Sequence, residues 1–384
     1  MNYGLMSYDY TTNLGNEIQS IAARRFLPEI DYYIEHEKIN LFKSDEKVKM
    51  IMNGWYLDCY KAWPPSEDID PLLISMHFTT TTEERRKEAI ITDESKQYLN
   101  NNGPVGCRDI ATVNFLEENN INAYFSGCLT LTLDKGESIE NDESYILVVS
   151  ELKEEITSFL KEKTNKDVYS IQQDLIPSFN KAFPPEMPPW LYNLSSFYNH
   201  KEKFFMAENL LRLYENADCV ITDRLHCALP CLALETPVLL FNNRGMRERF
   251  EGLNDLVQEV SFDEYKSNYN IFDVNNPPEN SKNYLKIRKD LIKKCSNFTG
   301  FINPTYKSDI SNEDFRTKTA LLLSNTNYST REYMKEVIRK LNDCNNQIND
   351  LNNRINILES KNKELENNKQ NNKISNIFKG LKRH

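Results

Sequence analysis

Short runs of β-branched and aromatic residues alternate with longer helical patterns through the first 305 residues of the chain. The extended runs begin near residues 3, 48, 71, 123, 145, 167, 218 and 237, with helical patterns between most of them. This alternation is typical of an open, largely parallel sheet with helices on its faces. A polar stretch at 134–144 separates two such sets. The predicted fold class is therefore α/β, with two facing Rossmann-like halves at 1–135 and 136–305.

The composition of the chain indicates which kinds of partner and which cellular compartment to expect. The 384-residue chain has a formal net charge of -10, which argues against a nucleic-acid-binding surface. Its eight cysteines show no CxxC pairing, and several lie in apolar runs, as expected for the reduced thiols of a cytoplasmic protein. The first 20 residues show no signal-peptide pattern, and no run of about 18 apolar residues occurs. We therefore expect neither a signal peptide nor a membrane span.

The pattern changes beyond residue 305, where Asn, Lys and Glu dominate. We predict a linker at 306–330, followed by a heptad repeat at 331–368. Position a is occupied by Met334, Leu341, Ile348, Ile355 and Asn362, and position d by Val337, Cys344, Leu351, Leu358 and Leu365. Ile at a with Leu at d favours two parallel strands, which predicts a homodimer held by a C-terminal coiled coil. The alternative is an amphipathic helix folded back on the core.

The end of the chain is basic. Residues 369–384 hold five basic and no acidic residues, with apolar residues at helical spacing. A basic amphipathic tail of this kind suits an anionic membrane surface and predicts peripheral contact with the inner face of the membrane. A frayed basic terminus is the alternative interpretation.

One strand-to-helix turn concentrates reactive side chains. An apolar run at 218–222 is followed by Asp223, Arg224 and His226 and then by a second apolar pattern. A helix N-terminus at the carboxyl end of a strand favours an anionic ligand, to which Arg224 adds a bidentate fork and His226 a group that titrates near neutrality. Pro230 favours a helix start close to Leu225. In the structural alternative, Asp223 caps the helix and Arg224 and His226 have no ligand.

Two other turns hold similar residues. After Gly106, Arg108 lies beside Asp109, which is placed to cap the following helix. A turn after the first strand contains Asn13, Gly15 and Asn16. Taken singly, each is an ordinary cap or loop. No metal is predicted, since Cys227 and Cys231 beside His226 lack a fourth ligand.

Together these turns resemble the polysaccharide pyruvyl transferase family. The matching residues are Asn13 and Gly15, then Gly106, Arg108 and Asp109, then Gly127 before an expected strand, then Arg224, Leu225, His226 and Pro237. The most specific element is the Arg-Leu-His turn. The sequence departs from the family at Asn16, where many members have Asp, and at Pro230 within the helix.

The resemblance implies a fold similar to two-domain GT-B glycosyltransferases and the transfer of pyruvate from phosphoenolpyruvate to sugar hydroxyls of a glycan or lipid-linked acceptor, usually as a ketal. It implies that Arg224 and His226 form the catalytic donor-site pair, with Leu225 contributing backbone. Arg108 and Asp109 would form the facing wall, and Arg244, or Arg247, would supply a further cation. His226 is then the hypothetical general acid or base, and no cofactor is needed.

Two other functions stay open at this point. A nucleotide-sugar glycosyltransferase could have the same architecture, because a fold does not determine a function. A scaffold without activity could use the coiled coil and basic tail to recruit partners to a membrane.

Overall fold

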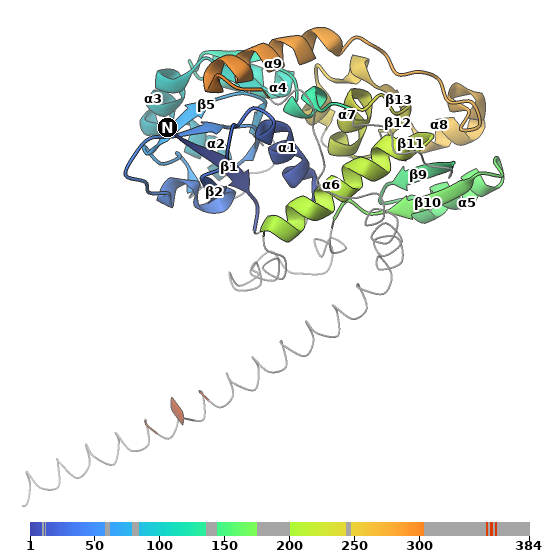
Figure 1. Ribbon diagram of the computed structural model, residues 1–384, viewed down its shortest axis with the longest axis horizontal. Coiled ribbons are helices and arrows are strands. Elements are labelled where there is room, and N and C mark those ends of the chain that lie inside the picture. Colours follow the sequence, from blue (N-terminus) through green and yellow to red (C-terminus); the bar gives the residue numbers. More distant parts are fainter. Residues whose placement is uncertain are drawn as a thin grey trace, which may run out of the picture. The chain divides into compact units, whose positions relative to one another are not determined.

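The computed structural model describes residues 1–9, 11, 13–57, 62–78, 84–135, 144–174, 200–242 and 247–302, and positions 351, 354, 355 and 358 (Figure 1). The chain forms two units, Met1–Leu323 and Ser324–His384. Both predicted halves lie in the first unit. Its described part is mixed α/β, and every pairing between its strands is parallel.

Two four-stranded sheets lie in the N-terminal half. The first has the order β2-β1-β3-β5, formed by β1 (Asn2–Ser7), β2 (Tyr32–Glu35), β3 (Val48–Ile51) and β5 (Ile69–Leu72). The second has the order β4-β6-β7-β8, formed by β4 (Gly54–Tyr56), β6 (Met76–Phe78), β7 (Val105–Cys107) and β8 (Ala123–Phe125). The runs expected as single strands at 48–56 and 71–78 are each divided between the sheets. Each division lies near a residue of positive φ, Gly54 at 146° and Ser75 at 54°, a conformation that interrupts an extended strand.

A five-stranded sheet forms the C-terminal half, in the order β10-β9-β11-β12-β13. Its strands are β9 (Tyr145–Val149), β10 (Asp167–Ile171), β11 (Cys219–Thr222), β12 (Val238–Phe241) and β13 (Gln258–Val260). All residues of β9, β11 and β12 are buried, as expected for apolar strands covered on both faces. The register pairs Val220 with Leu147 and with Val238.

Helices occupy the intervals between the strands. The α-helices are α1 (Gly15–Arg24), α2 (Glu84–Ile91), α3 (Asp93–Asn102), α4 (Ile110–Glu118), α5 (Lys153–Lys161), α6 (His200–Asn216), α7 (Leu225–Ala233), α8 (Phe262–Ser267) and α9 (Leu285–Thr299). The 3-10 helices are η1 (His36–Leu41), η3 (Leu129–Thr132), η6 (Arg247–Phe250), η7 (Asn254–Leu256) and η8 (Tyr269–Phe272). None of the described helices is long and apolar enough to span a membrane.

The strand expected after Gly127 is wrong. Gly127 has φ of 73°, and the next residues form the buried 3-10 helix η3. The reason lies in α9, whose Arg288 donates hydrogen bonds to the carbonyl oxygens of Leu131 at 2.7 Å and Leu133 at 2.5 Å. These carbonyls are therefore satisfied without a neighbouring strand.

The two halves share a hydrophobic core. One buried cluster includes Ile21 of α1, Leu129 of η3, Leu210 of α6 and Leu229 of α7. Helices α1 and α6 lie against each other (Figure 1), and two ion pairs of 2.7 Å link them, Arg24–Glu208 and the buried Lys203–Glu17. The carboxyl ends of strands from both halves are thereby held close together.

The second unit is described at four positions. Leu351, Arg354, Ile355 and Leu358 have helical backbone, and the three apolar side chains are 54%, 51% and 64% exposed. The rest of the predicted coiled coil, the linker at 306–330 and the basic tail lie outside the described residues. The dimeric coiled coil stays a prediction.

Candidate active site

In the turn between β11 and α7, the residue that caps the helix is not the predicted one. Helix α7 begins at Leu225, as Pro230 suggested, but the cap residue is Arg224 and makes no side-chain capping bond. Asp223 instead accepts hydrogen bonds from Ser150 Oγ at 2.8 Å and from the Glu151 backbone N–H at 3.2 Å. The expectation that Asp223 caps the helix is therefore wrong, because its carboxylate joins the carboxyl ends of β11 and β9.

Pro230 has a structural consequence for His226. Proline has no N–H, so Pro230 cannot donate to the carbonyl four residues earlier, which is that of His226. This carbonyl accepts a hydrogen bond from Gln173 Nε2 at 3.3 Å, and His226 has non-helical angles, φ -82° and ψ 21°. The segment after β10 therefore replaces a helical bond in the first turn of α7.

Acidic side chains surround Arg224. Its guanidinium is 2.6 Å from Asp174, 3.4 Å from Glu151 and 3.5 Å from Asp223, and the side chain is 12% exposed. An anionic ligand at Arg224 would have to compete with these carboxylates. The side chain of Leu225 lies in the hydrophobic core, so only its backbone is available to a ligand.

Arg108 and His226 meet across the two halves. Arg108 follows β7, is completely buried, and places Nη1 3.3 Å from His226 Nε2 and 3.4 Å from Gln19 Oε1. Since a guanidinium only donates, His226 Nε2 accepts this bond. Burial and the charge of Arg108 lower the pKa of His226 well below its usual value. The expectation that His226 titrates near neutrality is thus wrong for this state, in which the imidazole is neutral.

Part of the Arg108 guanidinium makes no hydrogen bond within the part of the chain that the structure describes. Its Nε and Nη2 atoms are buried and make no hydrogen bond to any described residue. Buried donors of a charged group are normally satisfied, so these atoms point to a ligand site.

Asp109 caps α4, as predicted. Its Oδ1 accepts from the Thr112 N–H at 2.9 Å and from Thr112 Oγ1 at 2.8 Å. Its Oδ2 lies 2.6 Å from His77 Nδ1 and 3.8 Å from Arg108 Nε. Burial would raise the pKa of this carboxyl, but the hydrogen bond from His77 and the charge of Arg108 hold it below its usual value.

Sequence reasoning missed two residues of this cluster, His77 and Arg249. His77 is in β6, and burial and the charge of Arg108 lower its pKa to about 4. Arg249 is in η6, 5.6 Å from the centre of the Trp55 ring, and its charge also lowers the pKa of His226 and His77. The only available signal was position, since His77 lies next to the last residue of the apolar run at 71–78.

In the turn after the first strand, Gly15 is the residue that lies next to the site. A Cβ on Gly15 would lie 2.4 Å from Gln173 Nε2 and 3.1 Å from His226 Cβ, so a side chain is excluded there. Asn13 Oδ1 accepts from the Gly15 N–H at 2.9 Å, and Asn16 Nδ2 donates to Thr11 Oγ1 at 3.0 Å. Asn13 and Asn16 thus shape the turn, while Gly15 contacts the catalytic candidate. Arg244 and the Arg247 side chain lie outside the described residues.

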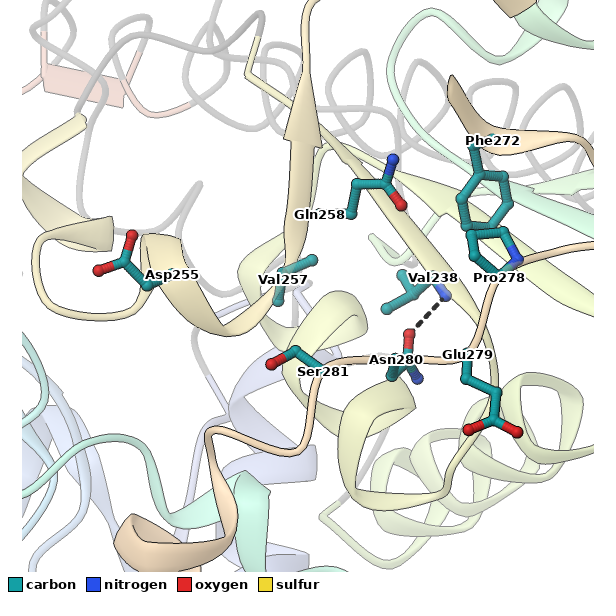
Figure 2. A pocket seen from close by; sticks show the side chains of 9 residues that line it. All are labelled: Val238, Asp255, Val257, Gln258, Phe272, Pro278, Glu279, Asn280 and Ser281. Carbon is teal, nitrogen blue, oxygen red and sulfur yellow. Dashed lines mark hydrogen bonds between the residues drawn. The ribbon is translucent and has the colours of Figure 1, made fainter. Parts of the chain in front are cut away.

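A separate pocket lies in the C-terminal half, at the amino ends of strands of the five-stranded sheet (Figure 2). It is lined at the amino ends of β12 and β13 by Val238 and Gln258, with Asp255 and Glu279 nearby, and Asn280 accepts from the Val238 N–H at 3.0 Å. Arg224 and His226 follow β11 at the carboxyl ends of the parallel strands, which is the opposite end of the same sheet. Across the described ranges, no three His, Cys, Asp or Glu side chains gather in a way that could hold a metal ion.

The fold and the site define an α/β protein whose reactive groups meet where the carboxyl ends of parallel strands from two halves converge. The model of the polysaccharide pyruvyl transferase family matches residues 13–245. The chain belongs to this family, which makes it a transferase of polysaccharide biosynthesis. No curated protein sequence matches the chain.

Several solved structures are similar to the chain. A functionally uncharacterised protein from Klebsiella pneumoniae subsp. pneumoniae NTUH-K2044 has a TM-score of 0.40 and 12% identity, covering 68% of this chain and 93% of its own. A UDP-N-acetylglucosamine 2-epimerase has a TM-score of 0.38 and 10% identity, with coverages of 85% and 97%. The wall teichoic acid polymerase TagF has a TM-score of 0.34 and 10% identity, with coverages of 88% and 89%.

Proposed function

We propose that this protein transfers a pyruvyl group from phosphoenolpyruvate to sugar hydroxyls of a glycan or lipid-linked acceptor, forming a ketal. The donor would bind where Arg108 of one half meets His226 of the other, in a GT-B-like arrangement of the halves. Family membership supports the reaction class, and the buried Arg108 is the observation that carries the choice of site.

Phosphoenolpyruvate suits the unsatisfied guanidinium. The molecule carries a phosphate and a carboxylate, which are the groups that arginine binds with paired hydrogen bonds. Nε and Nη2 of Arg108 make no hydrogen bond to any described residue, and Arg249 adds positive charge nearby. Arg224 would become a second anion-binding group if the donor displaced Asp174.

The proposed reaction balances without a cofactor. The methylene carbon of the donor gains a proton and becomes the methyl group, while one sugar hydroxyl oxygen bonds to the adjacent carbon. A second hydroxyl then adds at that carbon, and the bond to the phosphate oxygen breaks with its electron pair. One hydroxyl proton ends on the methyl group and the other on the released phosphate. His226, neutral in this structure, would accept or return a proton close to the donor.

Calorimetric titration of phosphoenolpyruvate into the full chain tests this proposal. We expect Arg108→Gln to weaken binding about 10- to 100-fold, because a charged hydrogen-bonding group contributes about 1.5–3 kcal/mol. Lys289→Gln, on the exposed face of α9, is the control and should bind like the wild type. Phosphate release with a sugar acceptor should fall in parallel.

Other results would point to the two alternatives. Binding of nucleoside diphosphates in place of phosphoenolpyruvate would favour a glycosyltransferase. No binding of either ligand would favour a scaffold without activity. Equal phosphoenolpyruvate binding by wild type and Arg108→Gln would remove Arg108 from the site.

A further inference from the structure

His77 is held in one orientation by Asp109. The Nδ1 atom lies 2.6 Å from Asp109 Oδ2, and both side chains are at most 2% exposed. The other carboxylate oxygen is occupied by two bonds from Thr112, so the carboxylate itself is fixed by the first turn of α4. Because an ionised carboxylate only accepts hydrogen bonds, His77 carries its proton on Nδ1.

The opposite ring nitrogen is therefore a free proton acceptor. His77 Nε2 is buried and has no hydrogen-bond partner among the described residues. Burial and the charge of Arg108 keep the ring neutral by lowering its pKa to about 4. In His226, by contrast, the Nε2 lone pair already accepts from Arg108 Nη1. Of these two imidazoles at the site, His77 has the available lone pair.

The position of His77 relative to the donor site is set by the shared carboxylate. Asp109 Oδ2 lies 2.6 Å from His77 Nδ1 and 3.8 Å from Arg108 Nε. The imidazole and the guanidinium are therefore neighbours on the same carboxylate oxygen. An Asp–His pair that fixes the tautomer and leaves Nε2 free is an arrangement suited to general-base catalysis.

We propose that His77, oriented by Asp109, is the base that accepts the proton of the attacking sugar hydroxyl. The oxygen of the second sugar hydroxyl uses its electron pair to bond to the central carbon of the donor, the bond from that carbon to the phosphate oxygen breaks with its electron pair, and the hydroxyl proton moves to His77 Nε2. The same proton then leaves with the departing phosphate, which restores the neutral ring. This inference rests on the proposed pyruvyl transfer and adds a division of roles, since Arg108 would bind the donor, His226 would exchange a proton close to the donor, and His77 would activate the acceptor.

The competing interpretation is that His77 only supports Asp109 as a helix cap. That role needs the Nδ1 proton but not Nε2. His77→Asn separates the two roles, because the Asn amide can donate to Asp109 yet offers no imidazole base. If His77 is the base, kcat should fall about 10²- to 10⁴-fold in His77→Asn, while the affinity for phosphoenolpyruvate should stay within about threefold of wild type. If His77 only supports Asp109, the kcat of His77→Asn should be nearly unchanged.

The experiment combines turnover, donor binding and nitrogen NMR on the full chain labelled with ¹⁵N-histidine. We expect the neutral Nδ1-protonated tautomer for His77 at pH 7, assigned by loss of its signals in His77→Asn. The control is His200→Asn, whose ring packs on Tyr33 at the start of α6, and it should leave turnover unchanged. Thermal unfolding of each variant verifies that it is folded.

The outcomes separate this inference from the proposed function. A wild type that transfers pyruvate together with a fully active His77→Asn would overturn the role of His77 alone. An Nε2-protonated or doubly protonated His77 would also overturn it, whatever the turnover. A wild type that neither binds phosphoenolpyruvate nor transfers pyruvate would overturn the proposed function and the base role together.

Discussion

At the scale of single residues, Asp109 links the start of α4 to His77 and Arg108 of the candidate site. One carboxylate oxygen caps α4, and the other lies 2.6 Å from His77 Nδ1 and 3.8 Å from Arg108 Nε. The cap predicted from sequence is therefore also part of the site. Because these contacts are buried, changes at Asp109 affect helix stability and chemistry together.

Two side chains with shifted pKa values make stability depend on pH in opposite directions. Burial and Arg108 lower the pKa of His77 to about 4, so the unfolded chain binds more protons there between about pH 4 and 6.5, and stability rises with pH in that range. Burial raises the pKa of Glu35 to about 7, so stability from Glu35 falls with pH between about 4.5 and 7.

We expect Glu35→Gln to make stability rise more steeply with pH between about 4.5 and 6.5, because the opposing slope is removed. The slope of stability with pH from each group approaches at most about 1.4 kcal/mol per pH unit, because each group exchanges one proton. Urea unfolding at a series of pH values measures both. A steeper slope in His77→Asn than in wild type would contradict this assignment.

Helix α7 shows how a proline within an element can be compensated from outside it. Pro230 leaves the His226 carbonyl without its helical donor, and Gln173 supplies one from the segment after β10. The neighbouring Gly15 permits this approach, since a Cβ there would lie 2.4 Å from the amide nitrogen of Gln173. The first turn of α7 is thus stabilised by two other segments.

A double-mutant cycle tests this compensation. Gln173→Ala should lower the free energy of unfolding by about 1 kcal/mol, because the buried carbonyl loses its donor. In a Pro230→Ala background the restored N–H can bond to the same carbonyl, so Gln173→Ala should have little effect there. Urea unfolding of the four proteins measures the coupling. An equal loss in both backgrounds would mean that Gln173 does not replace the helical bond.

At the scale of the whole molecule, the two halves are joined by a shared core and by ion pairs, among which Lys203–Glu17 is buried. The arrangement keeps Arg108 and His226 in contact although they are 118 residues apart. The second unit, Ser324–His384, carries the predicted coiled coil.

Sedimentation measures whether this second unit makes a dimer. We expect the full chain to be dimeric and a chain ending near residue 325 to be monomeric, because the heptad positions would be removed. Replacing Ile348 and Ile355 by Lys in the full chain should have the same effect. A truncated chain that stays dimeric would assign the contact to the first unit.

Much of the fold could be predicted because its signals are local. The buried runs of β9 and β11 and the start of α7 at Leu225 are confirmed, since apolar periodicity and proline act within a few residues. The strand after Gly127 is wrong because Arg288 of α9 satisfies its carbonyls. The cap at Asp223 is wrong because Ser150 and Glu151, which follow β9, bind its carboxylate.

The sequence by itself indicated the α/β alternation, the family and the turns that carry Arg108, Asp109, Arg224 and His226. Only the tertiary structure decided which of these groups meet. It surrounds Arg224 with acids, pairs Arg108 with His226, and brings His77 to Asp109 across 32 residues. The physical reason is that periodicity and turn chemistry depend on neighbours in the chain, whereas burial, charge pairing and pKa depend on neighbours in space.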